Sequence, residues 1–204
     1  MNQFIDAWQF VFKNWKYFLV LALPLIAIES TVGYLLIPLG DMTQPEDFIE
    51  FLESNSLVIG LVSITGIVLQ MAFIGGLYLS YMAIDSNKEI NPINALQSGL
   101  AKFFPLFGTF IIVTIVSAFG YLLLILPGIY LTARLALFPF YIMLEDQKIF
   151  QSISSSWENT DEHGSKLFVF TLVFVALTLI VALILSSTIP QGFIQTSMLA
   201  LSEY

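Results

Sequence analysis

The sequence predicts an all-α protein, a polytopic helical bundle of about five membrane spans in one transmembrane domain of residues 1–204. Hydrophobic residues make up 57% of the chain and charged residues 11%, whereas charged residues make up about 25% of an average soluble domain. Several apolar runs reach the roughly 20 residues that a helix needs to cross a bilayer core of about 30 Å. The run from Phe103 to Leu144 carries one charge, Arg134, and is broken only by Leu126-Pro127-Gly128, which predicts two spans joined by a tight turn.

Composition also excludes several classes of protein. The chain contains no cysteine, so a disulfide scaffold, a thiolate metal site and a cysteine nucleophile are all excluded. A net charge of -8 argues against a nucleic-acid partner, which would need a basic surface. The first apolar run is too long for the core of a cleavable signal peptide, and we expect none.

Five spans account for the apolar runs. The second is long enough to tilt or project from the membrane. The fourth is short and contains Pro139, which predicts a kinked or incomplete crossing. In chain order the spans are Tyr17–Leu39, Ser56–Ile84, Pro105–Leu126, Ile129–Leu144 and Leu167–Ile189.

The lysines predict how the spans are oriented, because short cytoplasmic segments retain basic residues. All six lysines fall in alternate segments, on one side of the predicted bundle: Lys13, Lys16, Lys88, Lys102, Lys148 and Lys166. We therefore expect the N-terminus in the cytoplasm and the C-terminus outside. The first outside loop is acidic, and Pro45 could open a short helix there.

Each lysine-containing segment also predicts an amphipathic helix lying in the membrane surface, because its apolar residues recur at helical spacing. Trp8 and Phe12 mark the first helix, Leu96 and Leu100 the second, and Trp157 the third. The repeated unit is then a surface helix, an outward span, a turn and an inward span. The alternative is that any in-plane helix would look like this.

The third unit lacks its return span. The tail from Gln191 to Tyr204 is too short and too polar to cross a bilayer. Either the chain ends outside, or it is a shortened version of a six-span protein.

Three polar residues are expected at one depth in the membrane. Counted at ~1.5 Å per residue, Glu29, Arg134 and Gln70 lie roughly 18, 15 and 21 Å from the inner ends of their spans. An unpaired charge at mid-membrane costs about 2.5 to 3.5 kcal/mol. We therefore expect Glu29 and Arg134 to form an inter-helix ion pair, completed by Gln70, Thr132 or Ser30.

Three roles for this set remain open: a structural staple between repeats, a binding site for an anionic head group or a solute, or an Arg134 that reaches the outer surface. The other candidates are weaker. Gly75 and Gly76 give the second span a small-residue face for close packing. His163 has no second histidine or cysteine with which to bind a metal, and no enzyme motif occurs. We expect no catalytic residue, no metal and no cofactor.

The order of residues around the Pro-Gly pair resembles a known family. It runs from Leu126-Pro127-Gly128-Ile129-Tyr130 through Arg134 and Pro139 to Glu145-Asp146 and Ser154-Ser155-Ser156-Trp157. This order is similar to the YciC-type family of uncharacterised bacterial inner-membrane proteins, and more distantly to the membrane domain of some glycerophosphodiester phosphodiesterases. The resemblance implies a bacterial inner membrane and about six spans, and no established reaction.

Two functions are therefore expected. The first is a non-enzymatic protein that binds or transports a lipid or a small solute. The second is a structural or regulatory partner of a membrane complex. Membrane lipids are the expected partners, with another membrane protein or a second copy of the chain as further candidates. A lipid binder or transporter should contain a cavity that reaches Glu29 and Arg134, whereas a scaffold should be close-packed there.

Overall fold

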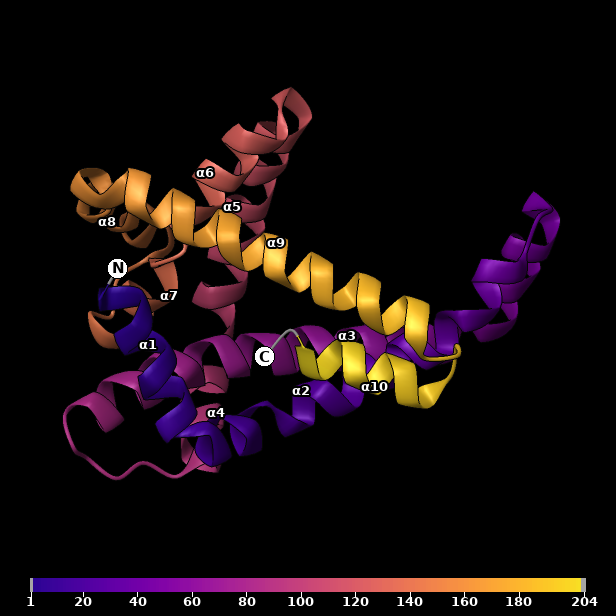
Figure 1. Ribbon diagram of the computed structural model, residues 1–204, viewed down its shortest axis with the longest axis horizontal. Helices are drawn as coiled ribbons and strands as arrows, with labels where there is room; N and C mark the ends of the chain where they lie inside the picture. The colour runs from indigo at the N-terminus through magenta and orange to yellow at the C-terminus, as the bar shows by residue number, and fades with distance from the viewer. Residues whose placement is uncertain (1, 203–204) are drawn as a thin grey trace. The chain divides into compact units, whose positions relative to one another are not determined.

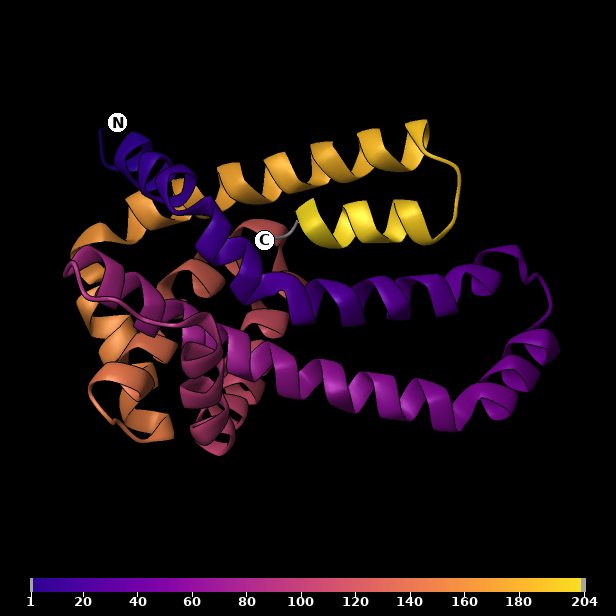
Figure 2. The same ribbon diagram turned by 90° about the horizontal axis from the view of Figure 1, so that it is seen from below.

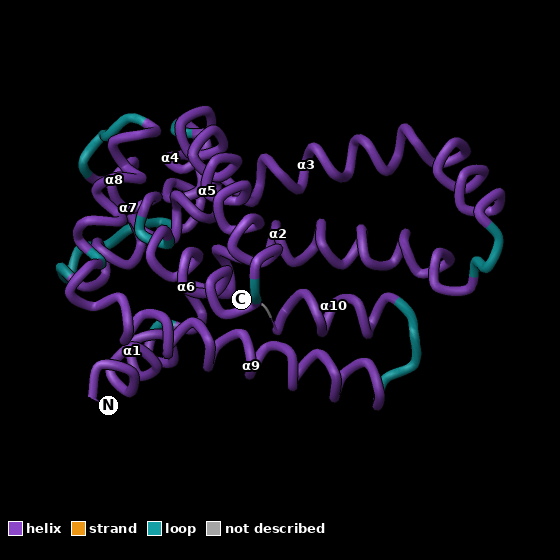
Figure 3. Tube along the Cα trace, turned by 90° about the horizontal axis from the view of Figure 1, so that it is seen from above, coloured by secondary structure: helices purple, strands orange, loops and turns teal. Residues whose placement is uncertain are grey.

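A computed structural model describes residues 2–202, without the side chains of residues 2–4 and 41, and every regular element in that range is a helix (Figure 3). Five of its helical segments are long and apolar enough to cross a membrane, which confirms the predicted all-α polytopic class. The terminal residues Met1, Glu203 and Tyr204, which we predicted on opposite sides of the membrane, lie outside the described range. The apolar segments are Trp15–Gly40, Pro45–Asp85, Phe103–Leu123, Ile125–Leu144 and Asp161–Thr188.

The order of the helices follows the predicted repeat. Helices α1 (Asn2–Lys13), α4 (Pro92–Ala101) and α8 (Ile149–Asn159) are the three expected surface helices. Each precedes an apolar helix, respectively α2 (Trp15–Leu36), α5 (Phe103–Leu123) and α9 (Gly164–Thr188). Asn91 caps α4, since its side chain accepts a hydrogen bond from the Ile93 N–H at 2.8 Å.

The chain folds into two compact units. Unit 1 comprises residues 1–70 and 180–204, and unit 2 comprises residues 71–179. The boundaries fall inside α3 (Pro45–Asp85) and inside α9. The placement of a single domain over residues 1–204 stays a prediction.

In unit 1 the C-terminal tail forms a helix, α10 (Phe193–Ser202), that packs beside α2 (Figure 2). The Phe193 ring meets Tyr34 edge-on at 6.1 Å between centroids. The Gln195 side chain donates to the Ile189 carbonyl at 2.8 Å and so caps the end of α9. Ten residues span about 15 Å, so the tail is too short to cross a bilayer, as expected. It is nevertheless an apolar helix and not the polar segment that we predicted.

The acidic helix predicted at Pro45 is not a separate element. It begins at Pro45 but continues into the second span as α3, a helix of 41 residues. No proline or other break intervenes after Pro45, so nothing ends the helix. At ~1.5 Å per residue it is about 60 Å long, roughly twice the thickness of a bilayer core.

In unit 2, α5 and α6 (Ile125–Leu135) form a helical hairpin (Figure 1). We expected its turn at Leu126-Pro127-Gly128, but the helix break is Leu124, with φ -165° and ψ 154°. Pro127 lies in the first turn of α6, where a proline removes no needed N–H. Gly128 permits the close approach of α5, because a Cβ on it would lie 2.3 Å from the Tyr121 ring.

The predicted fourth span is broken, as Pro139 indicated. Helix α6 ends at Leu135 and α7 (Phe138–Leu144) begins three residues later, with Pro139 in its first turn. The Phe140 N–H bonds to the Leu137 carbonyl rather than to that of Ala136. The Tyr78 hydroxyl from α3 donates to the Ala136 carbonyl at 2.7 Å. A side chain on a neighbouring helix thus satisfies a backbone group at the break, as a membrane environment requires.

The small-residue face of α3 packs against α4, which confirms its predicted role in close helix contact. A Cβ on Gly99 of α4 would lie 2.2 Å from the backbone oxygen of Ala72, and one on Gly75 would lie 2.7 Å from the Gly99 Cα. Next to this contact lies the core of unit 2, which is built from Met71, Leu106, Val113, Leu135, Phe138 and Ile142.

Candidate functional site

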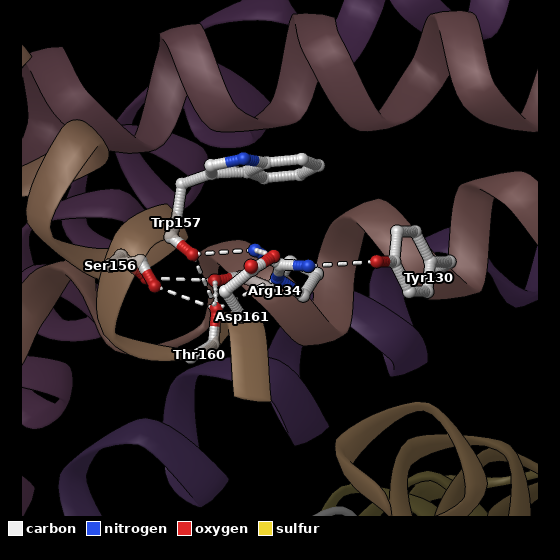
Figure 4. Close-up of polar contacts among 6 residues, drawn as sticks. All are labelled: Tyr130, Arg134, Ser156, Trp157, Thr160 and Asp161. Carbon is white, nitrogen blue, oxygen red and sulfur yellow. Dashed lines mark hydrogen bonds and ion pairs between the residues drawn. The ribbon is translucent and has the colours of Figure 1, made fainter. Parts of the chain in front are cut away.

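Arg134, the charge in the longest apolar run, is almost completely buried, with 2% of its surface exposed. Its guanidinium donates through Nε to the Thr160 hydroxyl at 2.9 Å and through Nη1 to the Tyr130 hydroxyl at 2.7 Å. Nη2 donates to the Trp157 carbonyl at 2.6 Å and to the Asp161 carboxylate at 2.9 Å (Figure 4). Four of the five N–H groups of the guanidinium are therefore used.

Aromatic rings and a glycine enclose the same guanidinium. Its central carbon lies 4.1 Å from the centre of the Trp157 ring and 5.6 Å from that of Tyr130. Both distances are within the range of cation–π attraction. Gly164 is buried against it, since a Cβ there would lie 3.1 Å from the Arg134 Nη1. The guanidinium is therefore packed against two aromatic rings and a glycine.

The backbone of Arg134 is held by the same segment. The Ser156 hydroxyl donates to the Arg134 carbonyl at 2.9 Å, and the Thr160 hydroxyl lies 3.1 Å from that oxygen. Both hydroxyl side chains are buried. Arg134 thus joins α6 to the C-terminal end of α8, where a positive charge also meets the negative end of the helix dipole.

The contacts of Arg134 place it beside the beginning of the fifth apolar segment, because Asp161 is the first residue of that segment and 75% of its side chain is exposed. We had counted Arg134 roughly 15 Å from the inner end of a straight span. That count does not apply to a helix that is broken after Leu135.

The expected set of Glu29, Arg134 and Gln70 is divided between the units. Glu29 and Gln70 belong to unit 1, and Arg134 belongs to unit 2. The carboxylate that the structure gives Arg134 is that of Asp161. The pairing of Glu29 with Arg134 stays a prediction, with one guanidinium N–H left for it. Thr132 and Ser30, its expected companions, bond to carbonyls of their own helices.

Sequence reasoning missed the partners of Arg134 because it looked for them inside other spans. Tyr130 lies four residues before Arg134, a spacing that places two side chains on one helix face. Asp161 follows the amphipathic segment that contains Trp157. An acidic residue at the beginning of a span could have been considered as a partner for an arginine near the end of the preceding one.

A cavity of about 490 Å³ lies elsewhere in unit 2, between α3, α5, α6 and α7. It reaches the surface, because Phe110 and Tyr121 line it and are 37% and 43% exposed. Arg134 does not line it. This cavity is therefore not the one expected at Glu29 and Arg134, and a cavity there stays a prediction. The cavity is lined by Ile74, Leu77, Tyr78, Phe110, Val113, Thr114, Ser117, Ala118, Tyr121, Thr132, Ala136, Phe138 and Pro139.

Among the described residues of this lining, the polar side chains are all hydroxyl-bearing. Tyr121 and Thr132 lie within 3.4 Å of each other near the turn between α5 and α6. Ser117 lies one helical turn before Tyr121 and is 7% exposed. The cavity can therefore offer hydroxyl groups for hydrogen bonds near this turn, in a lining that is otherwise mostly apolar.

Within residues 2–202, no cluster of three or more histidine, cysteine or acidic side chains could hold a metal ion. His163 lies exposed in η2 (Asp161–His163).

Comparison with known proteins places the chain in a family. The sequence model of the domain of unknown function DUF7847 matches residues 44–203. The chain belongs to this family.

A curated relative supports the membrane assignment. UPF0259 membrane protein plu2479 of Photorhabdus laumondii is 29% identical to this chain over 85 residues. Those residues are 42% of the chain and cover 33% of the relative, so the match spans about a third of that protein's length. No solved structure matches. The chain is a multi-pass membrane protein of an uncharacterised family.

Proposed function

We propose that this protein is a non-enzymatic integral membrane protein that binds an acyl chain of a membrane lipid in the cavity of unit 2. The observation that carries the proposal is the cavity itself, whose volume of about 490 Å³ lies within the range of about 300–1,000 Å³ typical of ligand sites. No acidic or basic side chain is among the described residues that line it. An apolar chain would therefore enter it without desolvating a charge.

The shape of the lining favours a long, narrow ligand over a small polar solute. Along α5 the lining extends from Phe110 to Tyr121, eleven residues apart, or about 17 Å at ~1.5 Å per residue. This length suits part of an acyl chain lying along the helix. Phe110, Thr114, Ala118 and Tyr121 are exposed, so a lipid could enter from the side.

Native mass spectrometry of the protein purified in a mild detergent tests this proposal. Ala118→Phe places a ring in the cavity, since Ala118 lines it and is exposed. Ile115→Phe is the matched control, because Ile115 is exposed on α5 but does not line the cavity. We expect a retained phospholipid in the natural protein and in Ile115→Phe, and its loss in Ala118→Phe. Equal lipid retention by all three proteins would contradict the proposal.

The alternative is a structural or regulatory subunit of a membrane complex. The burial of Arg134 favours it, because this charge is bonded to other residues of the chain and Arg134 does not line the cavity of unit 2. Under this alternative, a defined protein or a second copy of the chain would remain bound through purification, and Ala118→Phe would leave lipid content unchanged. The predicted pair of Glu29 with Arg134, aided by Gln70, would then be a structural staple between repeats.

We also propose a bacterial inner membrane as the location, with the N-terminus in the cytoplasm and the C-terminus outside. The lysine distribution and the resemblance to the YciC-type family support this. Because the chain has no cysteine, single cysteines can test the orientation with a membrane-impermeant maleimide on intact cells. Glu50→Cys should be labelled, and Ser86→Cys should be labelled only after lysis. The reverse pattern would invert the topology.

A further inference from the structure

Ser117 is the buried polar side chain of the cavity that lacks a hydrogen bond. It is 93% buried on the wall of the cavity, and its hydroxyl has no partner among the described residues. An isolated buried hydroxyl is costly and calls for an explanation. A ligand in the cavity would supply one.

Three other hydroxyls in the apolar helices of unit 2 bond to a carbonyl of their own helix. Ser80 bonds to the Gly76 carbonyl at 2.6 Å, and Thr109 bonds to the Pro105 carbonyl at 2.8 Å. Thr132, on the opposite wall of the cavity, bonds to the Gly128 carbonyl at 2.9 Å. Such local bonds to the carbonyl four residues earlier are the usual solution for a serine or threonine in an apolar helix. Ser117 does not use it.

The surroundings of Ser117 limit what its ligand can be. The described residues of the lining carry no acidic or basic side chain, so a charged group there would be buried without a counter-ion. The partner must therefore be an uncharged hydrogen-bond acceptor. It must also be attached to an apolar chain, because the lining beyond Ser117 passes Val113, Phe110 and Phe138.

The carbonyl of an acyl ester has both properties. We propose that the Ser117 hydroxyl donates a hydrogen bond to an acyl-ester carbonyl of a glycerolipid whose chain lies along α5 toward Phe110. This inference rests on the proposed lipid-binding function and names the group that the site recognises. The glycerol end of the lipid then lies at the Tyr121 and Thr132 end of the cavity, near the turn between α5 and α6.

Ester-linked and ether-linked lipids test the inference. Displacement of a fluorescent lipid from the purified full-length protein would be measured with diacyl phosphatidylglycerol and with its dialkyl ether analogue of equal chain length. The ether lacks only the carbonyls. The same titrations would be made on Ser117→Ala and on the control Thr109→Val, whose hydroxyl bonds to its own helix and does not line the cavity. Diacylglycerol as a third competitor distinguishes a neutral lipid from a phospholipid as the source of the ester.

We expect the natural protein and Thr109→Val to bind the ester about three- to tenfold more tightly than the ether, the value of one neutral hydrogen bond. In Ser117→Ala the two affinities should be equal, with the ether affinity unchanged. Equal affinities in the natural protein would overturn the inference while leaving lipid binding intact. If neither lipid displaces the probe and Ala118→Phe has no effect on probe binding, the proposed function itself fails.

Discussion

The guanidinium of Arg134 lies 4.1 Å from the centre of the Trp157 ring and donates to that residue's carbonyl at 2.6 Å. Trp157 of α8 thus contacts the guanidinium in two ways, through its ring and through its backbone carbonyl. This relationship joins the arginine of the longest apolar run to α8. Arg134 does not line the cavity in which we place the function.

Replacing Arg134 should therefore destabilise the fold. Arg134→Met removes the guanidinium hydrogen bonds to the Trp157 carbonyl and to the buried Thr160 hydroxyl, and we expect a loss of about 2–4 kcal/mol in the free energy of unfolding. Arg134→Lys should recover little of it, because an ammonium cannot reproduce the planar fork. Asp161→Asn should cost at most about 1 kcal/mol, since Asp161 is largely exposed. Chemical denaturation in detergent micelles measures all three.

A double-mutant cycle distinguishes the two partners proposed for Arg134. Arg134→Met and Thr160→Val should be coupled by about 1 kcal/mol or more, because the two side chains are in contact. The same cycle with Glu29→Gln should give a coupling below about 0.5 kcal/mol if the contact with α8 is the main one. A larger coupling to Glu29 would instead establish the pair predicted from the sequence.

The contact between α3 and α4 should tolerate no larger residue at Gly99. Gly99→Ala places a methyl group against the backbone of Ala72, and backbone cannot move aside as a flexible side chain can. We expect a loss of about 1–3 kcal/mol in unfolding experiments. Gly60→Ala is the control, since no atom lies within 4 Å of its new Cβ. It should be neutral or stabilising by up to about 1 kcal/mol, owing to helix propensity.

Tyr78 should stabilise the break between α6 and α7. Tyr78→Phe removes the hydroxyl that donates to the Ala136 carbonyl, and we expect the free energy of unfolding to fall by about 1–2 kcal/mol. Tyr34→Phe, at an exposed tyrosine of α2 whose ring contact with Phe193 the change preserves, is the comparison. Equal stability of the two variants would show that the carbonyl is satisfied in another way.

An ion pair outside the spans should make stability depend on pH. The side chain of Lys102 donates to Asp146, and this hydrogen bond, followed by the lysine charge, lowers the pKa of the Asp146 carboxyl from its ordinary value of 3.8. A carboxyl whose pKa is lower in the folded than in the unfolded protein stabilises the fold at pH values above its unfolded-state pKa. This contribution is lost as the pH falls through the folded-state pKa.

Asp146→Asn checks this contribution, because asparagine tolerates the left-handed backbone at this position, where φ is 54°. The difference in thermal midpoint between the natural protein and the variant should be constant above about pH 5 and should shrink below about pH 4. High salt should reduce it at every pH, because the pair is exposed to solvent. A difference that does not change with pH would contradict this origin.

The sequence by itself determined the class and the order of the elements. Long apolar runs must form helices in lipid, since no other open structure satisfies the backbone there, and the amphipathic segments before the first, third and fifth runs formed the expected α1, α4 and α8. Helix breaks were harder to place. Pro139 marked one break correctly. The hairpin turn, however, lies at Leu124 and not at Pro127-Gly128. In sequence, a proline in the first turn of a helix followed by a glycine in a helix contact looks the same as the Pro-Gly pair of a turn.

Only the tertiary structure decided which side chains meet. Counting along straight helices gave Arg134 a depth and suggested Glu29 as its partner, whereas a broken helix and the end of α8 gave it Trp157, Thr160 and Asp161. The cavity likewise depends on how α3, α5, α6 and α7 pack together, and Ser117 in the sequence is one hydroxyl among many. A partner or a cavity depends on distances between segments that are far apart in the chain, and one sequence records only the spacing within each segment.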